Sequence, residues 1–473
     1  MAWLAAAVAL TLGVCATRPV NPPVSRVDLA AGYRLDTRPP IVEDKENLVI
    51  LAFSGGGTCA AAFSYGVLEA LRRIEIEGPR GRRIRLLDHV DLITGVSGGS
   101  FTALAYGLYG ESLFGEYEQR FLKRDVEGEL LKRLLSPTQW GALWSKTWGR
   151  SEMAAQLYDE ILFDGATFAN LERRPGPLIV ATATDISTGG RLGFVQPTFD
   201  VLCSDLAAVP LSRAAAASSA VPLVLSPVTL NNYGGTCSYA MPPWLKVFSQ
   251  GGKSLRPAER AIRQLKDVET YADGAERPYI HLVDGGLADN LGMRGVLEVF
   301  EVMEALKMAG RPTRLDNARR IVVFVVNAAS SPKTNWDRSE APPGDLQILL
   351  RASGVPIAHY SFDAIELLKD TMVRWQNLRE IRNSVAAAGL RDPVVTRLTN
   401  VPDARIYAID VSFAALDDAS EREYLNNLPT SLVLPPEAVD RLRAAAGTIV
   451  LQSPEFKRLL HETGARLVET PAH

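Results

Sequence analysis

Cysteine is scarce in this 473-residue chain, and an excess of positive charge is missing altogether. The four cysteines include no pair spaced as CxxC, which argues against a structural zinc site. The net charge of −3 provides no overall attraction to nucleic acid, so we do not expect nucleic acid as a partner. The remaining composition, 47% hydrophobic and 22% charged, is that of a folded globular protein.

The N-terminus lacks a hydrophobic run long enough to cross a bilayer. Residues 1–14 are nearly all apolar, but a spanning helix needs roughly 20 such residues. Their length suits the apolar region of an export signal, although no basic residue precedes them. The run ends in Leu12-Gly13-Val14-Cys15, which resembles a bacterial lipoprotein processing site except at Val14. We therefore expect residues 1–15 to direct export to the periplasm or a membrane, with lipidation of Cys15 left open and a buried N-terminal helix as the alternative.

Two further cysteines bear on the same question. In an exported protein, Cys203 and Cys237 would meet the oxidising conditions in which disulfides persist. A disulfide across the loop between them and two buried free thiols are equal alternatives at this stage.

Apolar runs alternate with helical patterns through most of the chain. A continuous apolar run at residues 47–53 predicts a strand buried on both faces. Further strands are predicted at residues 90–94, 178–184, 279–283, 320–327 and 405–413. Helical spacing follows at residues 60–73, 98–109 and 294–308. This alternation predicts an α/β fold with a mostly parallel, doubly wound sheet flanked by helices. Residues 344–388 and 421–467 predict a largely helical C-terminal extension.

The domain organisation follows from the same patterns. Residues 16–44 are rich in Pro, Arg and Asp, which indicates a tether and an irregular lead-in. We expect residues 45–330 to form the core and residues 331–473 to form a helical region packed on it. No composition shift within the core indicates a linker.

The strongest local signal is Gly95-Val96-Ser97-Gly98-Gly99, which fits the G-x-S-x-G nucleophile elbow between a predicted strand and a predicted helix. The turn forces the serine into a strained backbone conformation, and the glycines allow the strand and the helix to approach each other. The serine hydroxyl then lies at a helix N-terminus, where the helix dipole favours developing negative charge. We predict that Ser97 is a nucleophile; a glycine-rich turn with a capping serine is the alternative.

Three successive glycines, Gly55, Gly56 and Gly57, directly follow the first predicted strand. Such a loop lets backbone N–H groups converge on an anion, either a phosphate or the oxyanion of an acyl-transfer intermediate. The loop lacks the Gly-Lys-Ser/Thr ending of a P-loop, and Ala60 replaces the last glycine of G-x-G-x-x-G. A tight strand-to-helix turn without a ligand is the alternative.

An acidic residue, Asp284, follows the strand predicted at residues 279–283 and precedes Gly285 and Gly286. Sites of α/β proteins lie at the carboxyl ends of the buried strands, where we expect this carboxylate. Burial beside a serine hydroxyl would raise its pKa above the usual value of about 3.9 and let it accept a proton. A turn aspartate that bonds its own backbone is the alternative.

The order of these three signals resembles that of the patatin-like phospholipases, in particular a bacterial exported type. The resemblance implies a catalytic dyad of Ser97 and Asp284 without a histidine, and it implies no metal or organic cofactor. It also implies an oxyanion hole formed by Gly55, Gly56, Gly57 and Gly98. Residues 217–222, Ala-Ser-Ser-Ala-Val-Pro, resemble a family stretch that packs near the site.

The likeness extends over residues 45–467 and makes residues 45–330 the expected catalytic core. It implies hydrolysis of a phospholipid or another acyl ester as the reaction. One departure stands at Thr58-Cys59, where the family usually carries Arg or Lys, and this leaves open a catalytically impaired lipid-binding or scaffold relative. We expect Cys59 to be a small packed residue.

Histidines define the other alternative, a Ser-His-Asp triad esterase. His359 and His461 follow Asp284 in the order that such an enzyme requires. Neither lies in a glycine-rich loop after a strand, which favours the dyad. His281 lies within a predicted strand, where we expect it to be packed.

Contact with a membrane surface is expected from two features. Trp140, Trp144 and Trp148 recur every fourth residue, which predicts one helix face suited to the membrane interface; core packing is the alternative. The second feature is a group of six arginines within residues 72–85. We expect these arginines either to contact anionic lipid headgroups or to lie in a solvated loop. The sequence does not indicate an oligomeric state.

Overall fold

The computed structural model describes residues 16–43, 46–77, 81, 83–241, 258–308, 310–334, 336–389 and 392–468. The expected export segment, residues 1–15 with Cys15, lies outside this part of the chain. An eight-stranded sheet forms the centre, with strand order β10-β9-β1-β4-β5-β8-β7 and with β6 beside β5. Its strands are β1 (Asn47–Phe53), β4 (Val90–Val96), β5 (Leu178–Asp185), β6 (Arg191–Gly193), β7 (Val228–Asn231), β8 (Tyr279–Asp284), β9 (Arg320–Asn327) and β10 (Arg405–Ser412).

The central sheet is mixed but mostly parallel. The strands from β10 to β5 run parallel to one another. Three others are antiparallel to their neighbours: β6 and β8 to β5, and β7 to β8. The predicted α/β class and all six predicted strands are confirmed, whereas β6 and β7 are too short to give a sequence signal.

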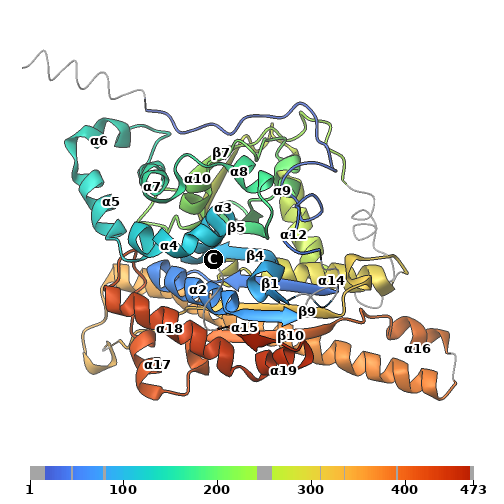
Figure 1. The fold of residues 1–473 in the computed structure, drawn as a ribbon. Helices are drawn as coiled ribbons and strands as arrows, with labels where there is room; N and C mark the ends of the chain where they lie inside the picture. The colour runs from blue at the N-terminus through green and yellow to red at the C-terminus, as the bar shows by residue number, and fades with distance from the viewer. Residues whose placement is uncertain are drawn as a thin grey trace, which may run out of the picture.

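Helices cover both faces of the sheet (Figure 1). Alternate residues of β1 point to opposite faces, as the pleat of a strand requires. Val49, Leu51 and Phe53 belong to a core shared with α2 (Gly57–Arg72), α3 (Gly98–Tyr109) and α18 (Pro436–Gln452). Ile50 and Ala52 belong to a second core shared with α14 (Arg294–Met308) and α15 (Asp345–Ala387). The doubly wound arrangement is therefore confirmed.

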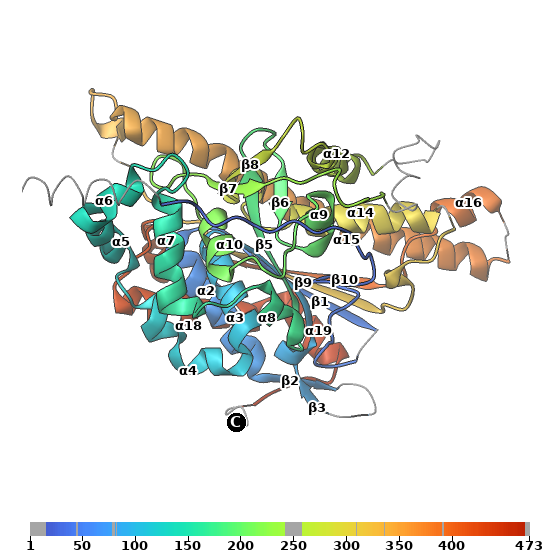
Figure 2. The same cartoon turned by 90° about the horizontal axis from the view of Figure 1, so that it is seen from above.

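The C-terminal region contributes to the main sheet as well as covering it. Its strand β10 pairs with β9 at the sheet edge. Its helices are α15, α16 (Pro393–Leu398), α17 (Ala419–Asn426), α18 and α19 (Pro454–Glu462), and α15 passes from one side of the molecule to the other (Figure 2). On the face of the central sheet opposite α15, helix α18 packs directly on α2.

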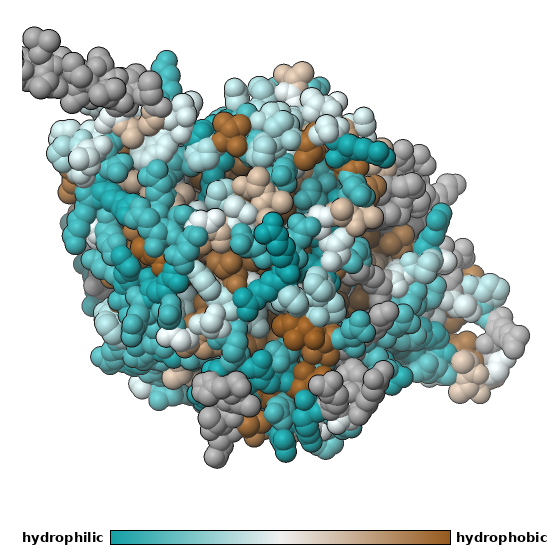
Figure 3. Space-filling model, turned by 45° about the horizontal axis from the view of Figure 1, so that its top comes forward, coloured by the Kyte–Doolittle hydropathy of each residue, from teal (hydrophilic) through white to brown (hydrophobic). Residues whose placement is uncertain are grey.

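The remaining elements surround this centre. A small antiparallel sheet contains β2 (Ile74–Glu77), β3 (Arg83–Arg85) and β11 (Arg466–Leu467). The other α-helices are α4 (Leu113–Tyr117), α5 (Val126–Leu135), α6 (Pro137–Leu143), α7 (Arg150–Tyr158), α8 (Phe168–Arg173), α9 (Gln196–Val201), α10 (Leu211–Ser218), α12 (Glu259–Glu269) and α13 (Gly286–Asp289). In the described ranges no helix combines the length and apolarity needed to cross a membrane. On the face shown in Figure 3, apolar residues form small groups among hydrophilic ones.

Of the two predicted membrane-contact features, the structure describes all of the tryptophan stripe and the arginine run except Arg80 and Arg82. Helix α6 ends at Leu143, so the three tryptophans do not share one helix face. Trp140 and Trp144 are exposed, whereas Trp148 is only 6% exposed and packs inside the protein. In the arginine run, Arg72 and Arg85 both form ion pairs with Glu111.

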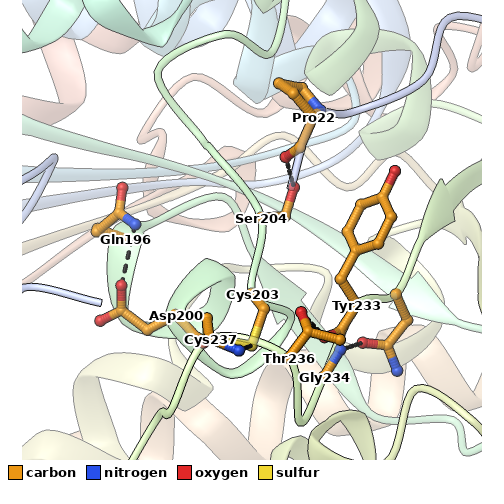
Figure 4. Close-up of a disulfide and its surroundings, with 10 residues drawn as sticks. Pro22, Gln196, Asp200, Cys203, Ser204, Tyr233, Gly234, Thr236 and Cys237 are labelled. Atoms are coloured by element: carbon orange, nitrogen blue, oxygen red, sulfur yellow. Dashed lines mark hydrogen bonds between the residues drawn. A yellow bond between two sulfur atoms is a disulfide. The ribbon is translucent and has the colours of Figure 1, made fainter. Parts of the chain in front are cut away.

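A disulfide joins Cys203 and Cys237 (Figure 4). Of the two alternatives that the sequence left open, a disulfide or two free thiols, the structure therefore has the disulfide. Cys203 follows α9, and the bond closes a loop with a sequence separation of 34 residues. Both cysteines are buried. The closed loop contains α10 and the stretch at residues 217–222, so it encloses a segment that reaches the site described next.

Candidate active site

Ser97 occupies the sharp turn between β4 and α3 that the elbow motif predicts. Its backbone has φ 47° and ψ −119°, a conformation that residues other than glycine rarely adopt. The surrounding contacts hold it there: the Ser97 N–H donates to the Ser218 hydroxyl at 2.8 Å. The strained turn places the Ser97 hydroxyl at the N-terminus of α3.

The Ser97 hydroxyl donates to the Asp284 carboxylate, with 2.8 Å between Oγ and Oδ2. The register of β5 explains this contact. Val96 pairs with Thr182, so Ser97 is level with Ala183, and Ala183 pairs with Asp284 on the other side. Asp284 is the last residue of β8, which runs antiparallel to β5 and reaches the site from the opposite direction.

Asp284 is buried, and its environment changes its acidity. Burial disfavours the charged carboxylate and raises its pKa to about 6. Hydrogen bonds from the Gly286 N–H, at 2.7 Å, and from Ser97 oppose this rise by favouring the charged form. The carboxylate is therefore mostly ionised at neutral pH but more basic than an exposed aspartate.

Residues 217–222 connect the serine turn to the aspartate turn. The Ser218 hydroxyl accepts from Ser97, and the Ser218 carbonyl accepts from the Gly285 N–H at 3.0 Å. The Ala220 carbonyl accepts from the Asp284 N–H, also at 3.0 Å. The sequence predicted this stretch near the site, but the role of the Ser218 hydroxyl depends on a tertiary contact and gave no signal.

The glycine loop lies directly against the serine turn. Gly57 has φ 60°, in the left-handed region that favours glycine. A Cβ atom on Gly98 would lie 2.0 Å from the Gly57 carbonyl oxygen. The serine turn and the glycine loop are therefore too close together for a side chain at Gly98. Gly57 and Gly98 are the first residues of α2 and α3, where N–H groups have no acceptor within the helix.

The glycine loop is also held from outside by two residues that the sequence analysis missed. The Gly55 N–H donates to the Asn290 carbonyl at 2.9 Å, and this bond occupies one of the predicted oxyanion donors. The Thr58 N–H donates to the Ser431 carbonyl at 2.8 Å. Ser431 is far away in sequence and Asn290 acts through its backbone, so no motif could have indicated either contact.

The other reactive side chains are placed apart from this chemistry. Cys59 is buried, and burial raises the pKa of its thiol to about 12, which leaves it protonated at neutral pH. His359 and His461 are exposed, whereas Ser97 and Asp284 are buried. The expectation that His281 is packed is wrong, because it is exposed and its Nδ1 lies 2.9 Å from the Thr229 hydroxyl. In the described part of the chain, no cluster of three or more His, Cys, Asp or Glu side chains could hold a metal ion.

Comparison with known proteins places this geometry in a family. A family described as patatin-like phospholipase matches residues 51–297, just over half of the chain, and this range includes Ser97 and Asp284. The chain is also similar to a cGAMP-activated phospholipase from Escherichia coli (strain TW11681), with 28% identity over 190 residues. That alignment covers 39% of this chain and 49% of the relative, so it spans about half of the relative's length.

Solved structures of human GIVD cytosolic phospholipase A2 are more distant in sequence. One has a TM-score of 0.40 and 14% identity, and the match covers 97% of this chain and 62% of that chain. Another, in complex with a methyl gamma-linolenyl fluorophosphonate inhibitor and terbium chloride, has a TM-score of 0.37 and 13% identity, covering 97% and 61%. This chain therefore spans less than two thirds of either structure.

Proposed function

The chain belongs to the patatin-like phospholipase family, and on that premise we propose that it hydrolyses carboxylic esters of lipids with a Ser97–Asp284 dyad. The observation that carries the proposal is the 2.8 Å hydrogen bond from the Ser97 hydroxyl to the buried Asp284 carboxylate. A hydroxyl and a base in this contact form the pair that nucleophilic catalysis needs.

In the first step, the Ser97 oxygen attacks the ester carbonyl while Asp284 takes the hydroxyl proton. The raised pKa of Asp284 suits this transfer, because a base is most effective when its pKa lies near the working pH. The carbon–oxygen bond of the ester then breaks, and the departing alcohol takes the proton back from Asp284. The product is an acyl group on Ser97.

In the second step, a water molecule attacks the acyl group and Asp284 accepts its proton. The free acid leaves, and Ser97 regains a proton from Asp284. Both steps pass through an oxyanion, which we propose is stabilised by the N–H groups of Gly56, Gly57 and Gly98. Removing one such donor typically costs about 2.7–4 kcal/mol of transition-state stabilisation.

We further propose a phospholipid or related acyl ester as substrate, and export of the protein to an oxidising compartment. The family supports the first point. The disulfide between Cys203 and Cys237 supports the second, because disulfides are rare in reducing cytosol. Lipidation of Cys15 and the division into a catalytic core at 45–330 and a helical region at 331–473 remain part of this proposal.

A fluorophosphonate probe, which reacts with activated serines, tests the dyad directly. We expect the wild-type chain to be labelled, and we expect Ser97→Ala to abolish labelling. Asp284→Asn should slow labelling and ester hydrolysis by roughly three orders of magnitude or more, as loss of a catalytic residue does. Esters of increasing chain length then define the preferred acyl group.

Two outcomes would contradict the proposal. Full activity in Asp284→Asn with none in His359→Ala or His461→Ala would indicate a triad esterase. Absence of labelling in the folded wild-type chain would indicate a lipid-binding relative, a result that Cys59 in place of the usual cation would then help to explain.

A further inference from the structure

Helices α5 and α6, together with Trp144 directly after α6, present four large apolar side chains to solvent. Leu131, Leu135, Trp140 and Trp144 are 54%, 64%, 51% and 77% exposed, and we call this group the α5–α6 surface. Leu131 and Leu135 are four residues apart on one helix, so they share a face. The backbone N–H of Trp144 donates to the backbone carbonyl of Trp140, so these two residues are also one helical turn apart. Both helices lie at the edge of the molecule, away from the central sheet (Figures 1 and 2).

Basic residues predominate along the segment that carries the α5–α6 surface. Residues 131–150 contain Lys132, Arg133, Lys146 and Arg150 but no Asp or Glu, whereas the acidic residues of α5, Glu127 and Glu129, lie in its first turn. Lys132 and Lys146 are exposed beside the apolar side chains, whereas Arg133 pairs with Glu160. Exposed tryptophans suit the headgroup region of a bilayer, and each nearby Lys or Arg contributes about 1 kcal/mol of attraction to anionic lipid.

The first described residue also lies near this surface. The Ser145 hydroxyl donates to the carbonyl of Ala16 at 2.6 Å, so Ala16 lies beside the residue that follows Trp144.

We propose that the α5–α6 surface docks the protein on an anionic lipid bilayer. Trp140 and Trp144 enter the headgroup region, while Lys132 and Lys146 contact lipid phosphates. The inference extends the proposed lipid hydrolysis, on which its biological purpose rests, by identifying the face of the protein that meets the lipid. The binding itself needs neither Ser97 nor Asp284.

A short chain of contacts connects this surface with the glycine loop. Glu127, in the first turn of α5, accepts from the Ser431 hydroxyl at 2.5 Å and from the Leu432 N–H at 3.3 Å. The Ser431 carbonyl in turn accepts from the Thr58 N–H beside Gly57. Helix α5, through which the protein would dock, is therefore hydrogen-bonded to the segment that supports the glycine loop.

The test measures sedimentation of the full chain with vesicles of diether lipids, which an ester hydrolase cannot cleave. Vesicles contain phosphatidylcholine alone or with about 30% phosphatidylglycerol. We expect Trp140→Ser/Trp144→Ser to weaken binding to the anionic vesicles by roughly tenfold or more. We expect Lys132→Glu/Lys146→Glu to weaken binding only where the anionic lipid is present.

The matched control is Phe362→Ser/Ile381→Ser, which removes two comparably exposed apolar side chains from α15. It should bind like the wild type. Circular dichroism and fluorophosphonate labelling of each variant separate a failure of docking from a failure of folding or of the proposed catalysis. Unchanged sedimentation of the tryptophan variant, or an equal loss in the α15 control, would overturn the proposal.

Bromine-labelled lipids distinguish the lipid from residues 1–15 as the occupant of the surface. Bromine quenches tryptophan fluorescence only at close range, so Trp140 and Trp144 in the bilayer should make the wild type more strongly quenched than its tryptophan variant. Equal quenching of the two bound proteins would mean that another segment holds the chain on the membrane, and it would overturn the proposal.

Discussion

The carboxylate of Asp284 loses contact with water on folding, and this loss determines the pH range in which it can accept a proton. Its pKa rises to about 6 because burial disfavours the charged form. Below that pH the group is protonated and cannot take the proton of Ser97. The pKa thus defines the acid limit of the proposed catalysis.

We expect kcat/KM on a neutral ester to fall about tenfold for each pH unit below about 6 and to level off above it. The measurement is a pH–rate profile with an uncharged substrate. Circular dichroism at each pH checks that the chain stays folded. An activity that stays constant down to pH values typical of exposed aspartates, near 3.9, would contradict this assignment of the base.

Individual residues were predictable where a local motif carries them. Ser97 and Asp284 each come at the end of a predicted strand and adjoin glycines, so short stretches of sequence were enough to single them out. Ser218 and Asn290 could not be assigned in this way, because their partners, Ser97 and Gly55, are brought to them only by the packed sheet. A serine or asparagine with a tertiary hydrogen bond has the same local sequence as one without.

At the scale of elements, α2 and α18 approach each other closely at Gly66. A Cβ atom there would lie 2.5 Å from the Arg443 carbonyl oxygen and 2.7 Å from the Arg443 Cα atom. These are backbone atoms, so the two helices would have to separate. Because α2 begins at the glycine loop, its position on α18 also affects the site.

We expect Gly66→Ala to lower the free energy of unfolding by about 1–3 kcal/mol, the usual effect of adding volume to a packed core. The matched control is Gly447→Ala in α18, where the nearest atom, the Ala70 Cβ, would be 3.9 Å away. That change should be neutral or should stabilise by up to about 1 kcal/mol through helix propensity. Urea denaturation measures both, and equal effects would contradict the close approach.

Long elements were predicted well and short ones were not. Strands β1 and β9 are almost entirely apolar, and α3 and α14 have regular helical spacing, so their positions follow from the sequence. The strands β6 and β7, with three and four residues, contain too few side chains to define a period. The direction of β8 could not be predicted either, because the sequence of a buried strand is the same whether its neighbour is parallel or antiparallel.

For the molecule as a whole, the disulfide between Cys203 and Cys237 reduces the number of conformations that the unfolded chain can adopt. The sequence separation of 34 residues corresponds to a stabilisation of about 3–4 kcal/mol in the chain-entropy description. The loop it closes contains Ser218, which contacts Ser97, so the bond also restrains the segment that holds the site together.

We expect Cys203→Ala/Cys237→Ala to lower the free energy of unfolding by about that amount. Thermal unfolding followed by circular dichroism, with and without a reducing agent, provides the measurement. The reducing agent should lower the Tm of the wild type and leave that of the double variant unchanged. A wild-type Tm that does not respond to reduction would contradict a stabilising role.

The pairing of β5 with both of its neighbours has an evolutionary consequence. Ser97 and Asp284 belong to different strands, and they meet only because each is level with Ala183. One residue inserted into β5 would displace one of them relative to the other by about 3.3 Å, further than a proton can pass directly. A descendant of this protein could therefore keep both residues and every glycine around them, and still have lost the reaction.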